Sequence, residues 1–367
     1  MESNLVQNLV NLKSLPETWA VKDFKEVVSD NSGGNKKLAK SNFLKEGDIA
    51  VVDQGKKLIA GFYNDTSLAV KTQPPYVVFG DHTRVFKYVD FPFIMGADGT
   101  KVLQPKKDNC ETKYLYYFFL SINVPNTGYN RHFKYLKELK IPLPSLDQQK
   151  KIAAILDAAD AYRQKTKALI LKYDELTQSL FLDMFGDPVT NPKGWERKSF
   201  TNVFGVTTGK LDSNQSVLDG QYPFFTCAKK VSSIDRYSFD QEALMLAGNN
   251  AAGVYDVKYY NGKFDAYQRT YVLTLNEGIN YQFFRFHLEQ KLKELQKVSI
   301  GSGTKYLTMK ILDRIMLLCP DQENQNMFTS RVLAIEAQKA QAQASLAQAE
   351  DLFNSLLQRA FKGKLTS

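Results

Sequence analysis

Several segments of this chain combine cationic side chains with amide or aromatic side chains within a few residues. They are "GKK" from Gly55, "NTGYNRHFK" from Asn126, "CAKK" from Cys227, "AGNNAAG" from Ala247, "AYQRTY" from Ala266 and "GSGTKYLT" from Gly301. Lys and Arg neutralise phosphates, while Asn, Gln and Arg supply the donor and acceptor pairs that read base edges in the major groove. We therefore predict DNA contacts from Lys56, Lys57, Asn126, Thr127, Tyr129, Asn130, Arg131, Lys229, Lys230, Asn249, Asn250, Gln268, Arg269, Thr304, Lys305 and Tyr306.

No comparable set of residues indicates catalysis. The chain has no G-x-x-x-x-G-K-[ST] phosphate loop, and its three histidines show no metal-binding spacing. The segment "QPPY" is similar to the tetrapeptide with which amino-methyltransferases hold an extruded adenine, but Gln73 replaces their Asp, Asn or Ser and no glycine-rich cofactor loop precedes it. We interpret "QPPY" as a proline turn that leads into the strand "YVVF". We expect no catalytic residue, metal ligand or cofactor in this chain.

Composition favours a polyanionic partner. Lys and Arg number 48 against 39 Asp and Glu, which gives a net charge of +9 and attracts polyanions at long range. The three cysteines lack C-x-x-C spacing, so neither a disulfide framework nor a zinc site is expected. The apolar runs fall far short of the roughly 18 residues of a membrane span, and "MESNLVQNL" does not have the pattern of a secretion signal. We expect a cytoplasmic protein without a membrane partner.

The chain repeats itself at one offset. "LPETWAVKDF" and "NPKGWERKSF" contain the only two tryptophans, Trp19 and Trp195, which are 176 residues apart. The same offset places "HFKYLKELKIPLPSLDQQKKI" over "TMKILDRIMLLCPDQENQNMF" and "LTQSLFLDMF" over "LFNSLLQRAF". Chance similarity between helices would explain the matching apolar pattern, but not the alignment of Pro144 with Pro320 as well. We interpret the chain as a duplication.

Between these anchors the halves diverge. We match "EGDIAVVDQGKKLIAGFYND" with "QEALMLAGNNAAGVYDVKYYNG", because each is an apolar strand, a glycine-rich turn and an aromatic strand. Aromatic and β-branched residues that alternate with such turns predict mostly β domains. The predicted fold class is α+β: two tandem mostly-β domains, residues 1–146 and 187–322, each followed by a long helix, residues 147–186 and 323–367.

The two long helices carry apolar residues at alternating steps of three and four, the heptad spacing of coiled coils. Asp147 is the expected N-cap of the first helix, and Gly186 with Pro188 is its expected stop. We predict that the helices pair as an antiparallel coiled coil with pseudo-twofold symmetry; the alternative is that each packs separately on its own domain. The predicted contact residues are Ile155, Tyr162, Leu169, Tyr173, Leu176, Leu180, Val332, Ile335, Leu346, Phe353 and Leu356.

These features together resemble the specificity subunits of type I restriction-modification systems, over essentially the whole chain. The resemblance lies in the Pro-x-x-Trp that opens each domain, in "IPLPSLDQQKKIAAIL" with its weaker copy, and in the helix ends "LTQSLFLDMFGDP" and "LFNSLLQRAFKGKL". The helix-entrance residues carry over by position, as Pro144, Gln149 and Ile152 in the first copy and Pro320, Gln325 and Phe328 in the second. The second copy departs from the pattern in "LLCPDQENQ", so its contacts there are expected to be weaker or differently arranged.

The resemblance implies a non-catalytic subunit whose two target-recognition domains each read half of a bipartite site in double-stranded DNA. It also implies that the paired helices set the gap between the half-sites and dock two methyltransferase subunits, with restriction and translocase subunits joining the complex. S-adenosylmethionine, ATP and Mg would then be bound by the partner chains. A rod of about 57 Å would correspond to roughly 16 base pairs. Two alternatives stay open: a single-chain methyltransferase or restriction enzyme with fused recognition domains, and a coiled-coil adaptor.

Overall fold

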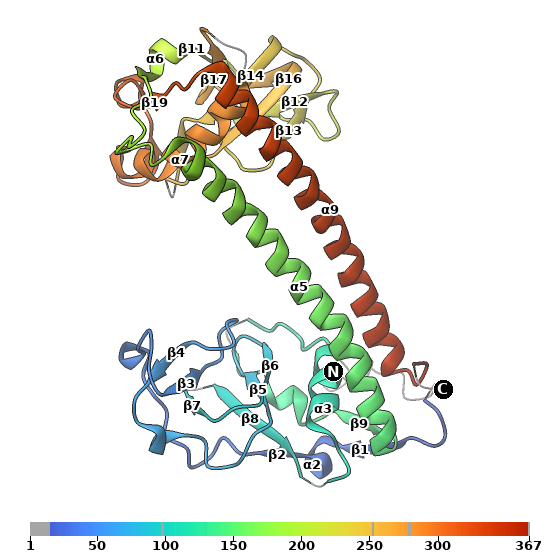
Figure 1. Cartoon of the computed structure of the whole chain (residues 1–367). Helices are drawn as coiled ribbons and strands as arrows, with labels where there is room; N and C mark the ends of the chain where they lie inside the picture. Colours follow the sequence, from blue (N-terminus) through green and yellow to red (C-terminus); the bar gives the residue numbers. More distant parts are fainter. Residues whose placement is uncertain are drawn as a thin grey trace. The chain divides into compact units, whose positions relative to one another are not determined.

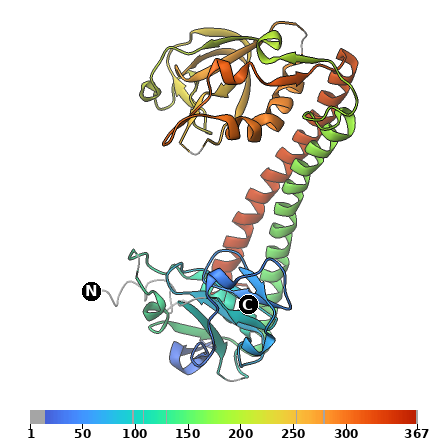
Figure 2. The same cartoon turned by 90° about the vertical axis from the view of Figure 1, so that its left-hand side faces the viewer.

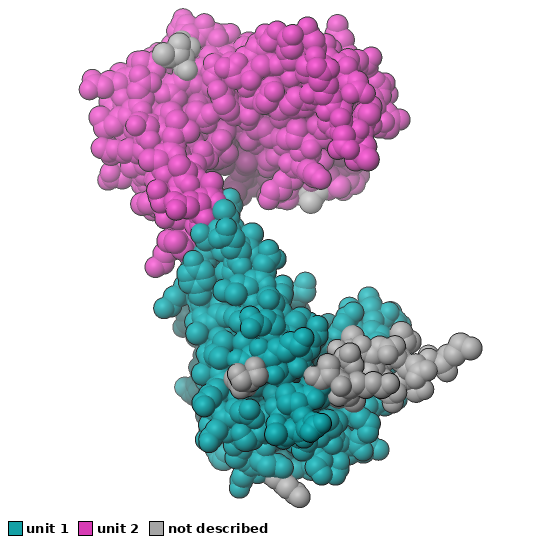
Figure 3. All heavy atoms as spheres, turned by 90° about the vertical axis from the view of Figure 1, so that its right-hand side faces the viewer, with its two compact units in different colours: residues 1–168, 343–367 teal, residues 169–342 magenta. Residues whose placement is uncertain are grey.

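The computed structural model describes residues 15–96, 99–106, 108–128, 130–251, 253–277 and 280–365. The chain divides into two compact units: unit 1 contains residues 1–168 and 343–367, and unit 2 contains residues 169–342 (Figure 3). Each unit holds one sheet-rich domain together with segments of the two long helices, α5 (Leu146–Phe185) and α9 (Gln322–Ala360) (Figure 1). The predicted α+β class with two repeated domains is confirmed.

The domain of unit 1 is built on a small antiparallel sheet of order β2-β8-β5-β6, beside a three-stranded sheet β4-β3-β7 and a two-stranded ladder β1-β9. Its strands are β1 (Ala20–Asp23), β2 (Val28–Asp30), β3 (Ile49–Val52), β4 (Gly61–Tyr63), β5 (Tyr76–Gly80), β6 (Phe86–Val89), β7 (Phe93–Met95), β8 (Thr100–Pro105) and β9 (Lys140–Leu143). Its short helices are α2 (Phe24–Val27), η2 (Lys40–Asn42), η3 (Thr66–Leu68), α3 (Thr112–Ser121) and α4 (Phe133–Leu136). The strand β5 begins at Tyr76, the last residue of "QPPY", so the tetrapeptide leads into a strand as predicted.

Aromatic side chains fill the core of unit 1. Every residue of β5 is buried, and the aromatic helix α3 packs against this sheet, with the rings of Phe86 and Phe119 stacked at 5.2 Å. Phe361, just beyond the end of α9, places its ring 5.3 Å from Tyr114 and 5.5 Å from Phe118 of α3. The domain therefore packs against both the beginning of α5 and the end of α9.

The domain of unit 2 has one larger sheet of order β11-β17-β14-β16-β12-β13 and two short ladders, β10-β19 and β15-β18. Its strands are β10 (Arg197–Ser199), β11 (Phe204–Thr208), β12 (Tyr222–Phe225), β13 (Ser232–Ile234), β14 (Phe239–Ala247), β15 (Asn249–Asn250), β16 (Val257–Ala266), β17 (Thr270–Leu275), β18 (Lys305–Tyr306) and β19 (Met316–Leu318). Its helices are α6 (Phe200–Val203), η4 (Ser213–Gln215), α7 (Tyr281–Val298) and α8 (Met309–Leu312).

The duplication is visible in the strand register. Val21 pairs with Pro142 in the β1-β9 ladder, and Arg197 pairs with Leu318 in the β10-β19 ladder, so both partners are displaced by the same 176 residues. The helices α2 and α6, and likewise α4 and α8, begin at positions that differ by this same offset. At the helix entrances, the Gln149 side chain donates to Pro144 O at 2.9 Å and the Gln325 side chain donates to Pro320 O at 2.7 Å.

One sequence match within the repeat is wrong. β3 runs parallel to β7, as β12 runs parallel to the end of β16. The central strand β5 lies between β8 and β6, as β14 lies between β17 and β16. The counterpart of "EGDIAVV" is therefore the β12 segment "YPFF", whereas "QEALMLA" corresponds to β5. The sequence pattern misled because an apolar strand followed by a glycine-rich turn occurs at both places, and only sheet order distinguishes them.

The two long helices are antiparallel within each unit (Figure 2). In unit 1, the guanidinium of Arg163 lies 4.1 Å from the centre of the Phe353 ring, and Lys167 Nζ lies 3.0 Å from Glu350 Oε1. In unit 2, Asp174 is bonded to Lys339, and further along α5 the Phe181 ring packs against Phe328 at 5.6 Å. Partners thus move backwards along α9 as α5 advances, which confirms antiparallel pairing. Each helix also packs on its own domain where it begins.

Four of the six predicted contact residues on α5 are shifted by one residue. Ile155, Tyr162, Leu169 and Leu176 are exposed by 37%, 55%, 42% and 49%, so their prediction as pairing residues is wrong. The buried or half-buried positions are instead Leu156, Arg163, Ile170 and Thr177. The remaining predicted contacts are buried or half-buried: Tyr173, Leu180, Val332, Ile335, Leu346, Phe353 and Leu356.

The shift has a physical cause in the side chains that replace the expected ones. Arg163 stacks its guanidinium on Phe353, and the Thr177 hydroxyl donates to Tyr173 O at 3.1 Å. Both polar residues can therefore lie between the helices, although hydrophobicity alone would place the adjacent residues, Tyr162 and Leu176, there instead.

The ends of α5 agree in part with the sequence. The helix begins at Leu146, and the hydroxyl of Ser145 accepts from Gln148 N at 3.4 Å, so Ser145 and not Asp147 caps it. Asp147 lies in the first turn, where a carboxylate still interacts favourably with the helix dipole. Gly186 has the left-handed backbone of a helix stop, with φ of 75°, and its N–H donates to Leu182 O at 2.8 Å.

Candidate nucleic-acid interface

In unit 2, the end of the central strand β14 meets the segment that leads into α8. Asn249 pairs with Tyr306 and Asn250 with Lys305 in the β15-β18 ladder. Leu307 N also donates to the carbonyl of Gly248 at 2.8 Å. Four predicted DNA-binding residues, distant in sequence, are thereby brought to one place, with Thr304 in the turn just before β18.

Arg269 belongs to the same group. Its carbonyl accepts from Gly248 N at 2.8 Å, and its guanidinium lies 5.8 Å from the centre of the Tyr306 ring. A Cβ at position 248 would lie 2.4 Å from that carbonyl, so only glycine fits there. The side chains enclose a cleft of about 500 Å³ that is lined by Thr208, Gly248, Gln268, Arg269, Tyr271 and Tyr306, among others.

The walls of this cleft are held by hydrogen bonds. The Gln268 side chain donates to Asp212 Oδ1 at 2.6 Å, which fixes it on the rim. The Tyr271 hydroxyl donates to Leu307 O at 2.8 Å, and burial raises the pKa of this phenol, which therefore remains protonated. A cation, an aromatic face and amides thus line one concave surface, the side-chain types that contact phosphates and bases.

The "CAKK" turn after β12 adjoins this cleft. The thiol of Cys227 donates to Arg269 O at 3.3 Å, and the ammonium of Lys258 donates to Ala228 O at 2.9 Å. Lys229 and Lys230 follow in this turn and are exposed. All predicted residues of unit 2 therefore lie on neighbouring loops.

In unit 1, Lys56 and Lys57 occupy the equivalent turn after β3 and are exposed. Asp53 Oδ1 accepts from Gly55 N at 2.8 Å, and Lys87 Nζ donates to the carbonyl of Asp53 at 2.7 Å. Burial lowers the pKa of Lys87, which the nearby Asp53 carboxylate opposes. The turn is thus fixed at its base while its two lysines face solvent.

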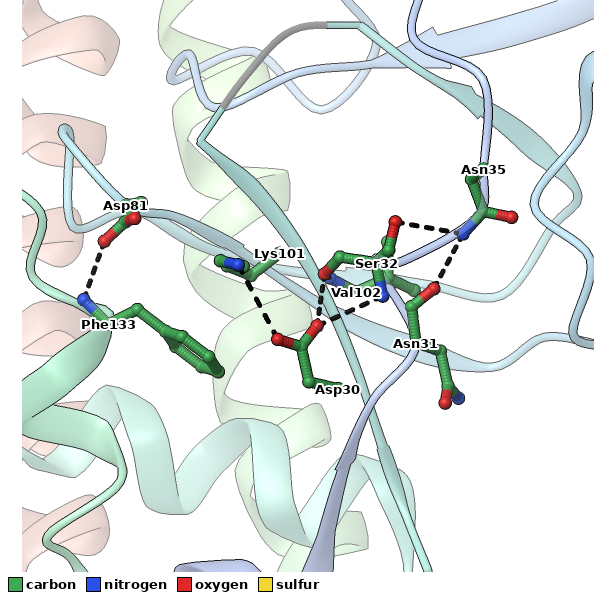
Figure 4. Close-up of polar contacts among 8 residues, drawn as sticks. All are labelled: Asp30, Asn31, Ser32, Asn35, Asp81, Lys101, Val102 and Phe133. Carbon is green, nitrogen blue, oxygen red and sulfur yellow. Dashed lines mark hydrogen bonds and ion pairs between the residues drawn. The ribbon is translucent and has the colours of Figure 1, made fainter.

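The segment that precedes α4 is held next to this turn. Asn126, Thr127, Asn130 and Arg131 are exposed, and Tyr129 lies outside the described residues. His132 N donates to Asp81 O at 3.0 Å, and Phe133 N donates to Asp81 Oδ1 at 2.7 Å, as Figure 4 shows. The carbonyl of Asp81 therefore has the role that Gly248 O has in unit 2.

Sequence reasoning missed two cations beside this segment. Arg84 donates from its guanidinium to Val124 O at 3.2 Å and has a left-handed backbone, with φ of 62°. Lys101 Nζ lies 4.9 Å from the centre of the Phe133 ring and 3.6 Å from Asp30 Oδ2 (Figure 4). A correct match of β5 with β14 would have pointed to the turn after β5, which contains Arg84, because "GNN" follows β14.

The structure gives no sign of a metal centre or a membrane span in the part of the chain that it describes. Within these residues, no three His, Cys, Asp or Glu side chains are grouped so that they could hold a metal ion. None of the described helices has the length and apolar character needed to cross a bilayer.

Comparison with known proteins identifies the family. The family model described as type I restriction modification DNA specificity domain matches twice, at residues 16–172 and 192–340. The specificity subunit of the type I restriction enzyme EcoDI from Escherichia coli is 34% identical over 179 residues, which are 48% of this chain and 39% of that protein. The MjaIX specificity subunit from Methanocaldococcus jannaschii is 25% identical over 210 residues, 49% of this chain and 46% of that protein. The chain thus matches less than half the length of either relative.

Solved structures share the fold. The crystal structure of a type I restriction-modification S subunit from M. genitalium has a TM-score of 0.64 at 17% identity, and the match covers 98% of this chain and 97% of that one. A structure described in terms of complex assembly and conformational transition of the type I system has a TM-score of 0.54 at 16% identity, over 96% of this chain and 99% of that chain. Because the family model matches both halves and covers most of the sequence, the chain belongs to the type I restriction-modification DNA specificity domain family.

Proposed function

We propose that this chain is the DNA-sequence-specificity subunit of a type I restriction-modification complex. Each domain reads one half of a bipartite site in double-stranded DNA. The observation that carries the proposal is that each unit gathers its loops of cations, amides and aromatics around the end of its central strand and the segment before a short helix. Phosphate contacts from the lysines and arginines would orient the domain, and amide and guanidinium groups would read base edges.

The paired helices set the gap between the half-sites in this proposal. Removing one heptad from α5 and its partner heptad from α9 would shorten a helical spacer by about 10 Å. The gap in the recognised sequence should then shorten by about 3 base pairs, while both half-sites stay the same. An altered half-site with an unchanged gap would show that the helices do not determine the spacing.

The helices also dock two methyltransferase subunits, and restriction and translocase subunits complete the complex in the cytoplasm. Supporting this, α5 exposes four apolar side chains at intervals of seven residues, Ile155, Tyr162, Leu169 and Leu176, a spacing suited to another helix. S-adenosylmethionine, ATP and Mg bind to these partners, which carry out methyl transfer and cleavage. The isolated chain should therefore transfer no methyl groups to duplex DNA when S-adenosylmethionine is supplied.

Mapping of methylated adenines across the host genome, with and without this chain, tests the proposal. The expected result is a bipartite methylated motif that disappears when the chain is deleted and returns when it is restored. A continuous motif, or a methylation pattern that deletion does not change, would contradict it.

A further inference from the structure

We infer that Asp81 is the positioning residue for the DNA-reading loops of unit 1, an inference that rests on the proposed function. Asp81 follows the last residue of β5 and is only 3% exposed. Its carboxylate accepts from Phe133 N at 2.7 Å, and its carbonyl accepts from His132 N at 3.0 Å and contacts His132 Nδ1 at 2.8 Å. One residue thus holds the backbone immediately after Arg131.

The turn that Asp81 begins also holds the other loops. The hydroxyl of Thr83 donates to the carbonyl of Gln54, and His82 N donates to Gln54 Oε1 at 3.3 Å. Gln54 lies two residues before Lys56. Arg84 donates to Val124 O at 3.2 Å, at the opposite end of the segment that contains Arg131. The turn is therefore the common support of both predicted DNA-contacting loops.

The geometry of this turn leaves little freedom. Arg84 keeps a left-handed backbone, which a residue other than glycine adopts only where its surroundings require it. A Cβ at Gly80 would lie 2.1 Å from Thr83 Oγ1 and 2.7 Å from Gln54 O, so the strand end and the Gln54 loop are in close contact. Loss of the Asp81 carboxylate removes the acceptor of Phe133 N, so Arg131 should shift relative to Lys56 and Lys57. Even a small shift matters, because a binding site tolerates displacements of only about 0.5 Å.

Unit 2 positions the corresponding segment without a carboxylate. There Leu307 N donates to the carbonyl of Gly248, which has no side chain, and the β15-β18 ladder provides the remaining support. The role of the Asp81 side chain is thus particular to unit 1. Its replacement should change one half of the recognised sequence and not the other.

The test is selection of DNA from a random duplex library by the full chain in complex with its methyltransferase partners. With Asp81→Ala, one half of the selected motif should lose its preference by about tenfold, the discrimination expected to be lost when one base contact is misplaced. The other half and the gap should not change. Asp81→Asn keeps an acceptor oxygen at this position and should restore most of the preference. Thr83→Val should weaken the same half of the motif. Because Thr83 is exposed, this variant keeps the core intact and provides the test if Asp81→Ala fails to fold.

Gln149→Ala is the matched control, because Gln149 is also buried in unit 1. Its side chain bonds to Asn109 O, Pro144 O and Glu111 N, each at 2.9 Å, but none of these residues is in a DNA-reading loop. This variant should lower the melting temperature and leave the motif unchanged. A motif that neither Asp81→Ala nor Thr83→Val alters, or that Gln149→Ala alters equally, would overturn the inference. If the unchanged chain selects no bipartite motif, the proposed function itself fails, a separate and recognisable outcome.

Discussion

Replacement of Lys56 and Lys57 by alanine gives a direct measure of the phosphate contacts that we predict for unit 1. Both side chains are exposed on the turn after β3, whose base is fixed by the bond from Gly55 N to Asp53 Oδ1 at 2.8 Å. The substitutions therefore remove charge without disturbing buried structure. If each lysine neutralises one phosphate, the salt dependence of binding should change by an amount that can be worked out.

Each phosphate contact contributes about 0.9 to the slope of log K against log salt concentration. The double variant should therefore have a slope smaller by about 1.8. Between about 50 and 200 mM salt, this difference reduces the affinity advantage of the unchanged chain roughly tenfold. The measurement is fluorescence anisotropy of a labelled duplex of arbitrary sequence, because phosphate contacts do not depend on sequence.

Lys22 and Lys25 provide the control. They are exposed on β1 and α2 in the same unit and belong to none of the predicted DNA-contacting segments. Their replacement by alanine reduces the net charge equally, so any effect of long-range attraction is matched in the two double variants. A change of slope confined to the Lys56 and Lys57 variant is the expected result. Equal slopes for the two variants would refute the assignment of this turn to the DNA interface.

Three further predictions concern stability. Ile152→Ala should cost about 2–4 kcal/mol because Ile152 is fully buried, whereas Ile155→Ala at an exposed position should cost less than about 1 kcal/mol, as chemical unfolding of unit 1 would show. Phe328→Ala should destabilise unit 2 by about 3–5 kcal/mol, because Phe328 is fully buried among aromatic rings, and loss of hydrogen-exchange protection in α7 would reveal it. Burial lowers the pKa of the His287 imidazole from 6.5 to about 3. Between about pH 3 and pH 6.5, His287 is therefore protonated in the unfolded chain but not in the folded one. Unit 2 should lose up to about 1.4 kcal/mol per pH unit as the pH falls below 6.5, and His287→Gln should flatten this slope in unfolding curves.

The duplication and the fold class could be predicted because unlike residue types coincide at one offset. At each helix entrance a glutamine side chain donates to a proline carbonyl, from Gln149 to Pro144 and from Gln325 to Pro320. The same residue types are therefore found at the same spacing in both copies. The phase of the helix seam could not be read from one helix. Tyr162 is the more apolar candidate, yet Arg163 faces α9 because Phe353 offers its ring to the guanidinium. Which residues of a helix face its neighbour depends on the side chains of that neighbour as well as on the helix's own apolar spacing.

The candidate DNA-contacting loops could be predicted only in part, because their support comes from distant residues. The residues next to Arg131 in the sequence are enough to predict it as a DNA contact. The turn from Asp81 to Arg84, by contrast, supports the loops through hydrogen bonds to Gln54 and Val124. These contacts cross 28 and 40 residues. Local composition contains no sign of them, and the correct strand match was needed to find the turn.

The two domains differ where they would meet DNA and agree where they meet the helices, which suggests how specificity can change. The β1-β9 and β10-β19 ladders keep one register, because each must fit against the same kind of helix junction. In unit 1 the segment is held by both the carboxylate and the carbonyl of Asp81, whereas in unit 2 it is held by the carbonyl of Gly248 and the β15-β18 ladder. Under the proposed function, a domain could therefore exchange its DNA-contacting loops, and with them its half-site, without altering the ladder that joins it to the helices. The common offset of 176 residues marks the part of the molecule that such exchange leaves intact.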